Sequence, residues 1–336
     1  GEDGDQFGYS VSISGDTLVV GASDEDGAGT GRGAAYVFER NQGGVADNWG
    51  QVTQLLASDA EDNDPFGESV SISNDTIVVG ASDEDGPGTG RGAAYVFERN
   101  QGGAADNWGQ VTKLTASDTA DYDWFGNSVA ISGDTVIVGA PGEDGATPSG
   151  NHGAAYLFVA GEGQWQQVAS PRASDAEDDD RFGIAVAISG DTAVVGADGE
   201  DGGGDDMGAA YVLERNQDGA DSWGEVKKLF GWDSTNDDWF GNSVAISGDT
   251  IVVGAYGKDD AGSLSGAAYV FERNKGLSAD YWGQVAKLTA SDAGDGDRFG
   301  YSVAISDDTI VVGAPWEQCS TGYDRGSAYI FARNKD

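Results

Sequence analysis

Hydrophobic and polar residues alternate in short segments along the whole chain, and these segments recur. In one copy, SVSIS at residues 69–73 alternates small polar with β-branched residues, which predicts a strand with one buried face. TIVVGA at residues 76–81 is apolar on both faces and predicts a strand inside a sheet. Asn74-Asp75 between them predicts a two-residue hairpin turn, because these residues tolerate positive φ angles. GAAYVFER at 92–99 and WGQVTKLTA at 108–116 predict two further strands.

A Phe-Gly pair marks each copy of this pattern. The pairs begin at Phe7, Phe66, Phe125, Phe182, Phe240 and Phe299, at intervals of 57–59 residues. Four short strands per copy, without an amphipathic helical pattern, predict four-stranded antiparallel blades. Six copies therefore predict an all-β, six-bladed β-propeller that forms a single domain over residues 1–336. A linear β-solenoid is the alternative, although solenoid coils are usually shorter.

The sixth copy differs from the others in length. It ends at AYIFARNKD, directly after its third strand. The first copy has only GEDGDQ ahead of its first strand, which is too short and too acidic to supply a fourth strand to another blade. We therefore expect a three-stranded sixth blade with an exposed outer edge. Exposed edges pair with other chains, so this edge is a candidate for self-association.

The motifs of the repeat resemble the FG-GAP repeat. Phe-Gly is followed by Gly-Ala-Pro at residues 139–141 and 313–315, and then by a Tyr-Val-Phe strand. The chain is similar to integrin α-subunit propellers, and more similar to bacterial and archaeal FG-GAP proteins, across all six copies. The resemblance implies an extracellular or cell-surface propeller for adhesion or ligand binding, often with calcium. Fold alone does not specify a function, because propellers host many.

The chain departs from the integrin pattern at two points. The proline of Gly-Ala-Pro is replaced in four copies, by Ser23, Ser82, Asp198 and Tyr256. The connection that carries calcium in integrins has only two residues here, such as Asn74-Asp75. Two residues cannot surround a cation that prefers six to eight oxygen ligands, so the integrin calcium site does not transfer to this chain.

The charge of the chain is strongly negative. It has 58 acidic and 18 basic residues, for a formal net charge of −40. Nucleic acid and anionic lipid would repel such a surface, and no apolar run is long enough for membrane insertion. This balance is typical of halophilic proteins or of proteins exposed to divalent cations.

The chain has one cysteine, Cys319, which excludes an internal disulfide. We expect a mature segment of a longer extracellular precursor.

The acidic residues recur in fixed positions ahead of each Phe-Gly, as D-x-x-D-x-D-x-F-G. The triad members are Asp59, Asp62, Asp64, Asp118, Asp121, Asp123, Asp175, Asp178, Asp180, Asp233, Asp238, Asp292, Asp295 and Asp297, with Asn236 in the fifth copy. Three carboxylates at this spacing could converge on one Ca²⁺ ion. Alternatively, one aspartate caps the loop backbone and the others are solvated. In a four-stranded meander these loops share one end with the acidic loops after each second strand, which predicts one strongly negative face.

Candidate ligand-binding residues are those that break the repeat. Tryptophan recurs at the start of the fourth strand and is expected in the core, whereas Trp124, Trp232, Trp239 and Trp316 break this pattern and are candidates for a ligand surface. His152 has no nucleophile placed beside it in the sequence, and Cys319 is expected to be an inert loop thiol.

These features together predict a non-enzymatic binding or adhesion module. Its expected partner is a protein or carbohydrate at the cell surface, and its acidic loop face is expected to bind cations, with Ca²⁺ as the expected ion. A structural subunit of a cell-surface assembly, joined through the open sheet edge, is the alternative. A polysaccharide-active enzyme is a third reading, because paired acids could serve a glycosidase.

Overall fold

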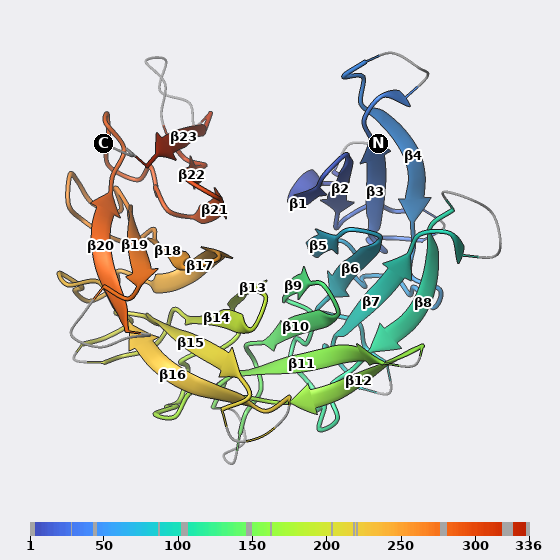
Figure 1. The fold of residues 1–336 in the computed structure, drawn as a ribbon, viewed down its shortest axis with the longest axis horizontal. Helices are drawn as coiled ribbons and strands as arrows, with labels where there is room; N and C mark the ends of the chain where they lie inside the picture. The colour runs from blue at the N-terminus through green and yellow to red at the C-terminus, as the bar shows by residue number, and fades with distance from the viewer. Residues whose placement is uncertain are drawn as a thin grey trace. The chain divides into compact units, whose positions relative to one another are not determined.

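Strands account for almost all the regular secondary structure of the described residues. The computed structural model describes residues 4–27, 29–42, 46–86, 88–101, 107–145, 150–161, 163–202, 204–217, 219, 221–275, 281–317 and 325–333. Within these ranges, 23 strands form six antiparallel sheets. The sheets are the blades of a six-bladed β-propeller, as the repeat predicted, and the solenoid alternative is wrong (Figure 1). No helix among the described residues is long and apolar enough to cross a membrane.

The chain contains two compact units, and the single domain expected from the repeat stays a prediction. Unit 1 is Gly1–Ala146 with Ala154–Ser170, and unit 2 is Thr147–Gly153 with Pro171–Asp336. Blades one to three belong to unit 1, and blades four to six belong to unit 2.

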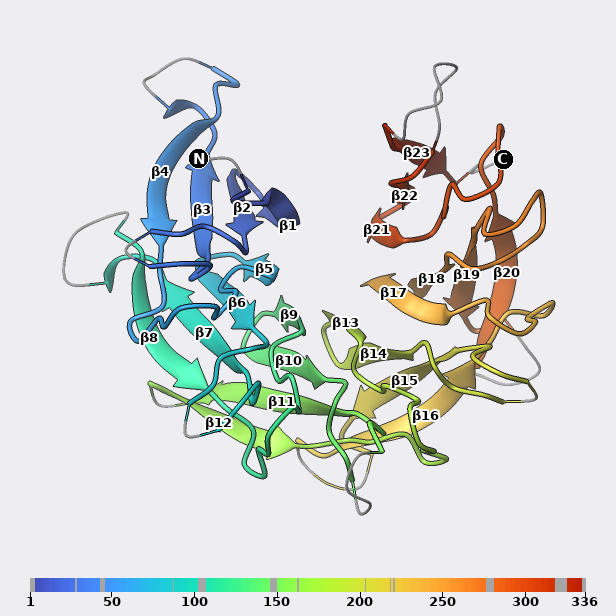
Figure 2. The ribbon, with the colours of Figure 1, turned by 180° about the vertical axis from the view of Figure 1, so that it is seen from behind.

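Each blade of unit 1 is a four-stranded meander. Its strands are β1 (Phe7–Ser14), β2 (Thr17–Ala22), β3 (Ala34–Glu39), β4 (Gly50–Leu55), β5 (Ser69–Ser73), β6 (Thr76–Ala81), β7 (Ala93–Glu98), β8 (Gly109–Leu114), β9 (Ser128–Ser132), β10 (Thr135–Ala140), β11 (Ala154–Gly161) and β12 (Gln164–Ala169). The first strands β1, β5 and β9 lie next to one another, and the fourth strands lie on the opposite side (Figures 1 and 2).

Unit 2 repeats this arrangement with one strand fewer. Its strands are β13 (Ala185–Ser189), β14 (Thr192–Ala197), β15 (Ala209–Arg215), β16 (Trp223–Leu229), β17 (Phe240–Ser247), β18 (Thr250–Ala255), β19 (Ala267–Arg273), β20 (Trp282–Leu288), β21 (Ser302–Ser306), β22 (Thr309–Ala314) and β23 (Ser327–Ala332). The sixth blade has the order β21-β22-β23, which confirms that it is three-stranded in the described part of the chain.

Turn chemistry explains why the strands end where the sequence predicted. Asn74 has a φ angle of 53° between β5 and β6, and Gly133 has 57° at the same place in the next blade. A two-residue hairpin requires such angles, and asparagine and glycine adopt them at little cost. The alternation of residues in β5 then buries Val70 and Ile72 on one face.

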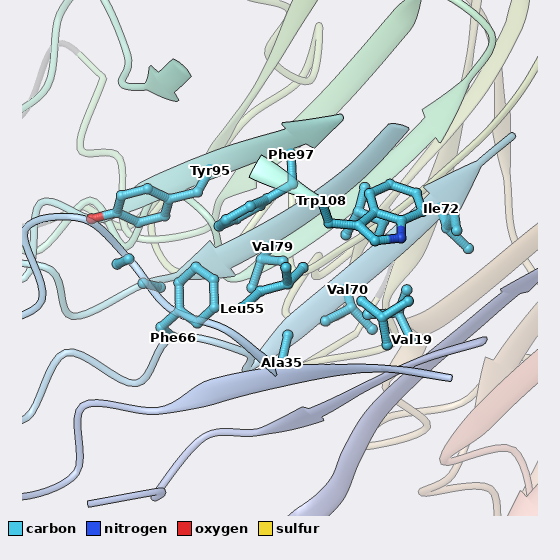
Figure 3. Close-up of a cluster of buried hydrophobic side chains, with 14 of the residues drawn as sticks. Val19, Ala35, Leu55, Phe66, Val70, Ile72, Val79, Tyr95, Phe97 and Trp108 are labelled. Atoms are coloured by element: carbon cyan, nitrogen blue, oxygen red, sulfur yellow. The ribbon is translucent and has the colours of Figure 1, made fainter. Parts of the chain in front are cut away.

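Successive blades pack face to face. We call the blade surface that carries the Phe-Gly phenylalanine its Phe face, and the other surface its back face. Phe66, Tyr95 and Trp108 on the Phe face of blade two pack against Val19 and Leu55 on the back face of blade one (Figure 3). Burial of these side chains is the main stabilising term for such a stack.

The Phe-Gly pair itself belongs to this core. Phe66 is fully buried and meets the ring of Tyr95 edge-on, at a centroid distance of 5.4 Å. Gly67 has a φ angle of 99°, and a Cβ atom there would lie 2.3 Å from the carbonyl oxygen of Ala34. Glycine is therefore required by the close approach of two backbones. The repeat motif builds the blade junction and leaves the surrounding loops to carry function.

Candidate functional site

The two acidic loops of neighbouring repeats interlock at one end of each unit, which we call the loop end. Asn63 N–H, in the loop before blade two, donates to the carbonyl of Thr30 in the β2–β3 loop at 2.8 Å. The Asp62 carboxylate accepts from Thr30 N–H at 3.2 Å and from Arg32 Nε at 2.8 Å. Asp121 and Arg91 form the same 2.8 Å pair one repeat later. These contacts bring the acidic loops together as the meander topology predicted.

The last aspartate of each triad caps the loop backbone. Each carboxylate accepts a hydrogen bond from the N–H three residues earlier. The five bonds are Glu61 to Asp64 (2.8 Å), Ala120 to Asp123 (2.6 Å), Glu177 to Asp180 (2.7 Å), Thr235 to Asp238 (2.7 Å) and Gly294 to Asp297 (2.6 Å). All five side chains are buried, so the bonds satisfy groups that have lost their water.

The first aspartate of the triad binds a tyrosine of the third strand or a lysine of the fourth. Asp175 accepts from Tyr211 Oη at 2.8 Å and from Lys228 Nζ at 2.7 Å. Burial alone would raise the pKa of Asp175, but these hydrogen bonds outweigh it and hold that pKa below its usual value. The other pairs are Asp59 with Lys113, Asp233 with Tyr269 and Lys287, and Asp292 with Tyr329. Asp118 is exposed at the equivalent turn.

The middle aspartate of each triad binds a third set of partners. Asp62 and Asp121 pair with arginines, Asp178 lies 3.3 Å from His152 Nε2, and Asp295 accepts from Ser263 N–H at 3.2 Å. The three members of a triad thus bind different parts of the protein. No group of three or more His, Cys, Asp or Glu side chains among the described residues is arranged to hold a metal ion. This geometry fits backbone capping and ion pairing better than a shared calcium ion, and calcium binding stays a prediction.

Two of the capping carboxylates are strongly perturbed. Burial, followed by the negative charges of Glu143, Asp118 and Asp144, raises the pKa of Asp123 to about 6 despite its backbone hydrogen bond. Burial and the charge of Glu200 raise the pKa of Asp180 to about 6 in the same way. Both groups titrate near neutral pH, and desolvation is the largest cause in each case.

Blade five replaces one buried acid by a buried base. After the second strand, blades two and four place Glu84 and Glu200 in the loop, whereas blade five has Lys258. The buried Lys258 ammonium donates to the carbonyl of Asp233 at 2.6 Å and to Asp238 at 3.1 Å. It also donates to Thr235 Oγ1 at 3.0 Å. The buried site of Lys258 was not predicted from the sequence, although a lysine in an otherwise acidic loop is a visible signal.

Two of the four candidate tryptophans belong to one aromatic cluster in unit 2. Trp239 lies 4.9 Å from Tyr256, Tyr256 lies 5.6 Å from Tyr301, and Tyr301 lies 5.0 Å from Trp316, between ring centroids. The Arg298 guanidinium lies 4.4 Å from the Trp316 ring centre and 5.5 Å from that of Tyr256. We call these five residues the aromatic row. Tyr256 stood out in the sequence only as a replacement of the Gly-Ala-Pro proline, and Tyr301 and Arg298 were missed as site residues because only the fold joins them.

The other two candidate tryptophans lie elsewhere. Trp124 belongs to unit 1. Trp232 is 63% exposed and lines a separate cavity of about 180 Å³ with Phe230 and Tyr281. Of the four candidates, only Trp239 and Trp316 belong to the aromatic row. Of the repeated tryptophans, Trp108, Trp223 and Trp282 are buried, as expected for core residues, whereas Trp49 is exposed. Cys319 lies outside the described residues.

The six sheets and their interlocking loops define a β-propeller, and comparison with protein families identifies which kind. The FG-GAP repeat family matches residues 1–38, 49–97, 108–158, 165–213, 223–271 and 282–331. The chain belongs to the FG-GAP repeat family.

A solved structure shows the same fold without close sequence similarity. The crystal structure of Chaetomium thermophilum Sqt1 aligns with a TM-score of 0.54 at 15% sequence identity, over 93% of this chain and 68% of that one. At that identity, the likeness concerns the fold alone. No curated protein sequence matches the chain.

Proposed function

We propose that this chain is an extracellular, non-enzymatic binding module that contacts a protein or carbohydrate ligand through the aromatic row of unit 2. The observation that carries the proposal is the convergence of large aromatic side chains and an arginine at positions that vary between the copies. Trp239, Tyr256, Arg298, Tyr301 and Trp316 come from two blades, and none of the five belongs to the repeated core set. A repeat maintains the fold, so a cluster of departures from it is a candidate for function.

The chemistry of the row suits ligand binding. Trp, Tyr and Arg dominate the energetic centres of binding surfaces, because they combine large contact areas with polar groups. Tyr301 is 44% exposed and Trp316 is 36% exposed, so their rings are available to a ligand. The loops of the row also carry the exposed carboxylates of Asp237 and Asp259. These would favour a ligand with hydroxyl groups or positive charge beside an apolar face.

The test is a binding assay with matched tryptophan variants. A glycan array and a panel of cationic surface proteins would be probed with the chain and with the variant W239A/W316A. We expect that variant to lose at least about tenfold in affinity, which corresponds to about 1.4 kcal/mol. W124A serves as the control, because Trp124 breaks the repeat at the same position as Trp239 but in unit 1. Equal binding by the three proteins would overturn the proposal.

The alternative function, a structural subunit joined through a sheet edge, is favoured by one observation. Blade six has three strands in the described part of the chain, and its outer strand β23 pairs only with β22. An assembly role would use backbone pairing at β23 and would not need the aromatic row. The W239A/W316A variant should then assemble normally.

A further inference from the structure

The loop that leaves the fourth strand of blade four departs from the repeat at two consecutive positions. The other copies have Ala-Ser-Asp there, at residues 57–59, 116–118, 173–175 and 290–292. In this loop Gly231 and Trp232 replace the alanine and the serine, and Phe230 precedes them. Phe230 is 58% exposed and Trp232 is 63% exposed. Two large exposed rings at one place, where other copies have small residues, indicate a binding surface.

The serine that Trp232 replaces pairs with a polar side chain of the next blade in other copies. In unit 1, Ser58 N–H donates to Gln110 Oε1 at 3.0 Å, and Gln110 Nε2 donates back to the Ser58 hydroxyl at 3.0 Å. In unit 2, Ser174 binds Glu225 in the same two places, with its N–H at 3.0 Å and its hydroxyl at 3.1 Å. The backbone and the hydroxyl of the serine thus each satisfy one end of the facing side chain.

Trp232 keeps the first of these two bonds and loses the second. Its N–H donates to Gln284 Oε1 at 2.9 Å. Gln284 Nε2 is buried, and no hydrogen-bond partner for it exists among the described residues. The bond from Trp232 fixes Oε1 as the acceptor, so the unpaired end of the amide is its donor. A buried donor without an acceptor is costly, and an oxygen supplied by a ligand would pair it.

This amide belongs to a cavity with aromatic walls. Gln284 lines the cavity of about 180 Å³ together with Phe230, Trp232 and Tyr281. Lys227 lines it too, and its ammonium lies 4.7 Å from the ring centre of Tyr281. In the part of the chain that the structure describes, Lys227 forms no ion pair. The cavity therefore combines three aromatic side chains with two donors that can bind ligand oxygens.

We propose that this cavity binds one neutral sugar residue of an oligosaccharide. The apolar C–H face of the sugar ring would pack against Trp232, and a hydroxyl oxygen would accept from Gln284 Nε2 in place of the missing serine. A second hydroxyl would accept from Lys227. An apolar occupant would leave the Gln284 donor unpaired, and a net charge of −40 disfavours an anionic glycan.

Binding requires a local rearrangement. Gln284 Nε2 is closed to solvent, so a ligand oxygen reaches it only when a neighbouring side chain moves. We expect that side chain to be Trp232, because it is the most exposed of the aromatic residues of the cavity. The site goes beyond the proposed function, because it shares no residue with the aromatic row.

The test is isothermal titration of the intact chain with cellopentaose, maltopentaose and mannopentaose. We expect at least one of them to bind with a millimolar or lower Kd, and W232S to weaken that binding at least about tenfold. W232S returns the serine of the other copies, so its hydroxyl can pair with Gln284. The melting temperature of W232S should therefore not fall, which separates lost recognition from lost stability.

A matched pair of amide variants tests the role of Gln284. Q284L should weaken the binding at least about tenfold, whereas Q110L should leave it unchanged, because Gln110 is fully paired with Ser58. W239A/W316A should bind these sugars like the parent chain, so a failure of the aromatic row would leave this result intact.

Four outcomes would each overturn the proposal. They are no binding of the three sugars at about 10 mM, equal binding by W232S and the parent, equal effects of Q284L and Q110L, and tighter binding of tetragalacturonate than of any neutral sugar. The last outcome would assign the cavity to an anionic glycan held by Lys227.

Discussion

Blades four and five carry opposite charges at the same position of the loop after their second strand, Glu200 in blade four and Lys258 in blade five. Both place a buried capping aspartate, Asp180 or Asp238, under the loop end. Blade four adds the buried acid Glu200 and neutralises it with Lys228 from its fourth strand, at 2.5 Å. Blade five instead puts the ammonium of Lys258 directly among the loop oxygens.

The difference shows what the acidic loops require. A lysine ammonium in blade five binds a carbonyl, a hydroxyl and a carboxylate, so this set of oxygens accepts positive charge. In blade four the lysine, Lys228, binds Glu200 and Asp175 instead, and the pKa of Asp180 is raised to about 6. The repeated acids therefore cap the loop backbone or pair with lysines. Blades four and five offset the negative charge of these acids with lysines at different positions.

The largest expected effect is the loss of the internal cation of blade five. K258M leaves the Asp238 carboxylate buried beside an apolar side chain. Removing one member of a buried ion pair typically costs about 3–5 kcal/mol. We expect a loss of this order in the free energy of unfolding, measured by denaturant titration. K275M is the control, because Lys275 forms only a half-exposed pair with Glu272 and its loss should cost under about 1 kcal/mol. Equal losses would show that the ammonium of Lys258 is not stabilising.

The pH dependence of stability tests two capping aspartates whose pKa is raised, Asp123 and Asp180. Asp123 and Asp180 have native pKa values of about 6, above the usual 3.8. Between these values the native state binds more protons than the unfolded state, so stability falls as the pH rises through this window. A shift of about two units corresponds to roughly 3 kcal/mol per group as an upper value. We expect the melting temperature to be higher at pH 5 than at pH 7.

A double variant assigns that pH effect. In D123N/D180N the amide oxygen still accepts the capping hydrogen bond but the side chain no longer ionises. The gain in melting temperature from pH 7 to pH 5, at fixed salt, should therefore shrink. An unchanged gain would attribute the pH effect to general charge repulsion. Asp175, whose pKa is lowered, contributes in the opposite sense, but its contribution is lost only below its unfolded pKa, near 3.8.

A smaller effect is expected for the lysine of blade four. Lys228 bridges Asp175 and Glu200 but remains partly exposed, so solvent screens the pair. K228M should lower the free energy of unfolding by about 1–2 kcal/mol, less than K258M. K227M is the neighbouring control, since Lys227 lies 4.7 Å from the ring centre of Tyr281 and binds no buried acid. A loss in K228M as large as that in K258M would remove the distinction between the two blades.

The fold could be predicted from the sequence because the signals are local and repeated. β5 and β6 begin and end at the predicted residues, since alternation and the Asn74-Asp75 turn define them without tertiary contacts. The missing fourth strand of blade six was also visible. The partners of the acids were not, because Asp62 binds Arg32 from the preceding repeat and Asp59 binds Lys113 from the end of its own blade. Such pairings depend on how loops fold over one another.

The aromatic row shows the same limit at a longer range. Trp239 and Trp316 stood out in the sequence as tryptophans outside the fourth-strand position. Tyr256 and Tyr301 connect them only because blades five and six bring their rings together. A side chain that is ordinary in composition becomes part of a site through the fold, and no local pattern signals this.

The smallest expected effect is that of calcium at high ionic strength. The members of a triad bind separate protein groups: Asp121 pairs with Arg91, and Asp123 caps Ala120. A calcium ion would have to displace these partners before it could gather six or more oxygens. A net charge of −40 still makes any salt stabilising through screening, with a Debye length near 3 Å at about 1 M. We therefore expect melting curves in about 1 M NaCl to be nearly identical with EDTA and with millimolar Ca²⁺.

The contradicting outcome is a rise in melting temperature with Ca²⁺ that D121N/D123N abolishes. Such a rise would show that the loop rearranges around the ion, because a ligand that binds only the native state stabilises it by mass action.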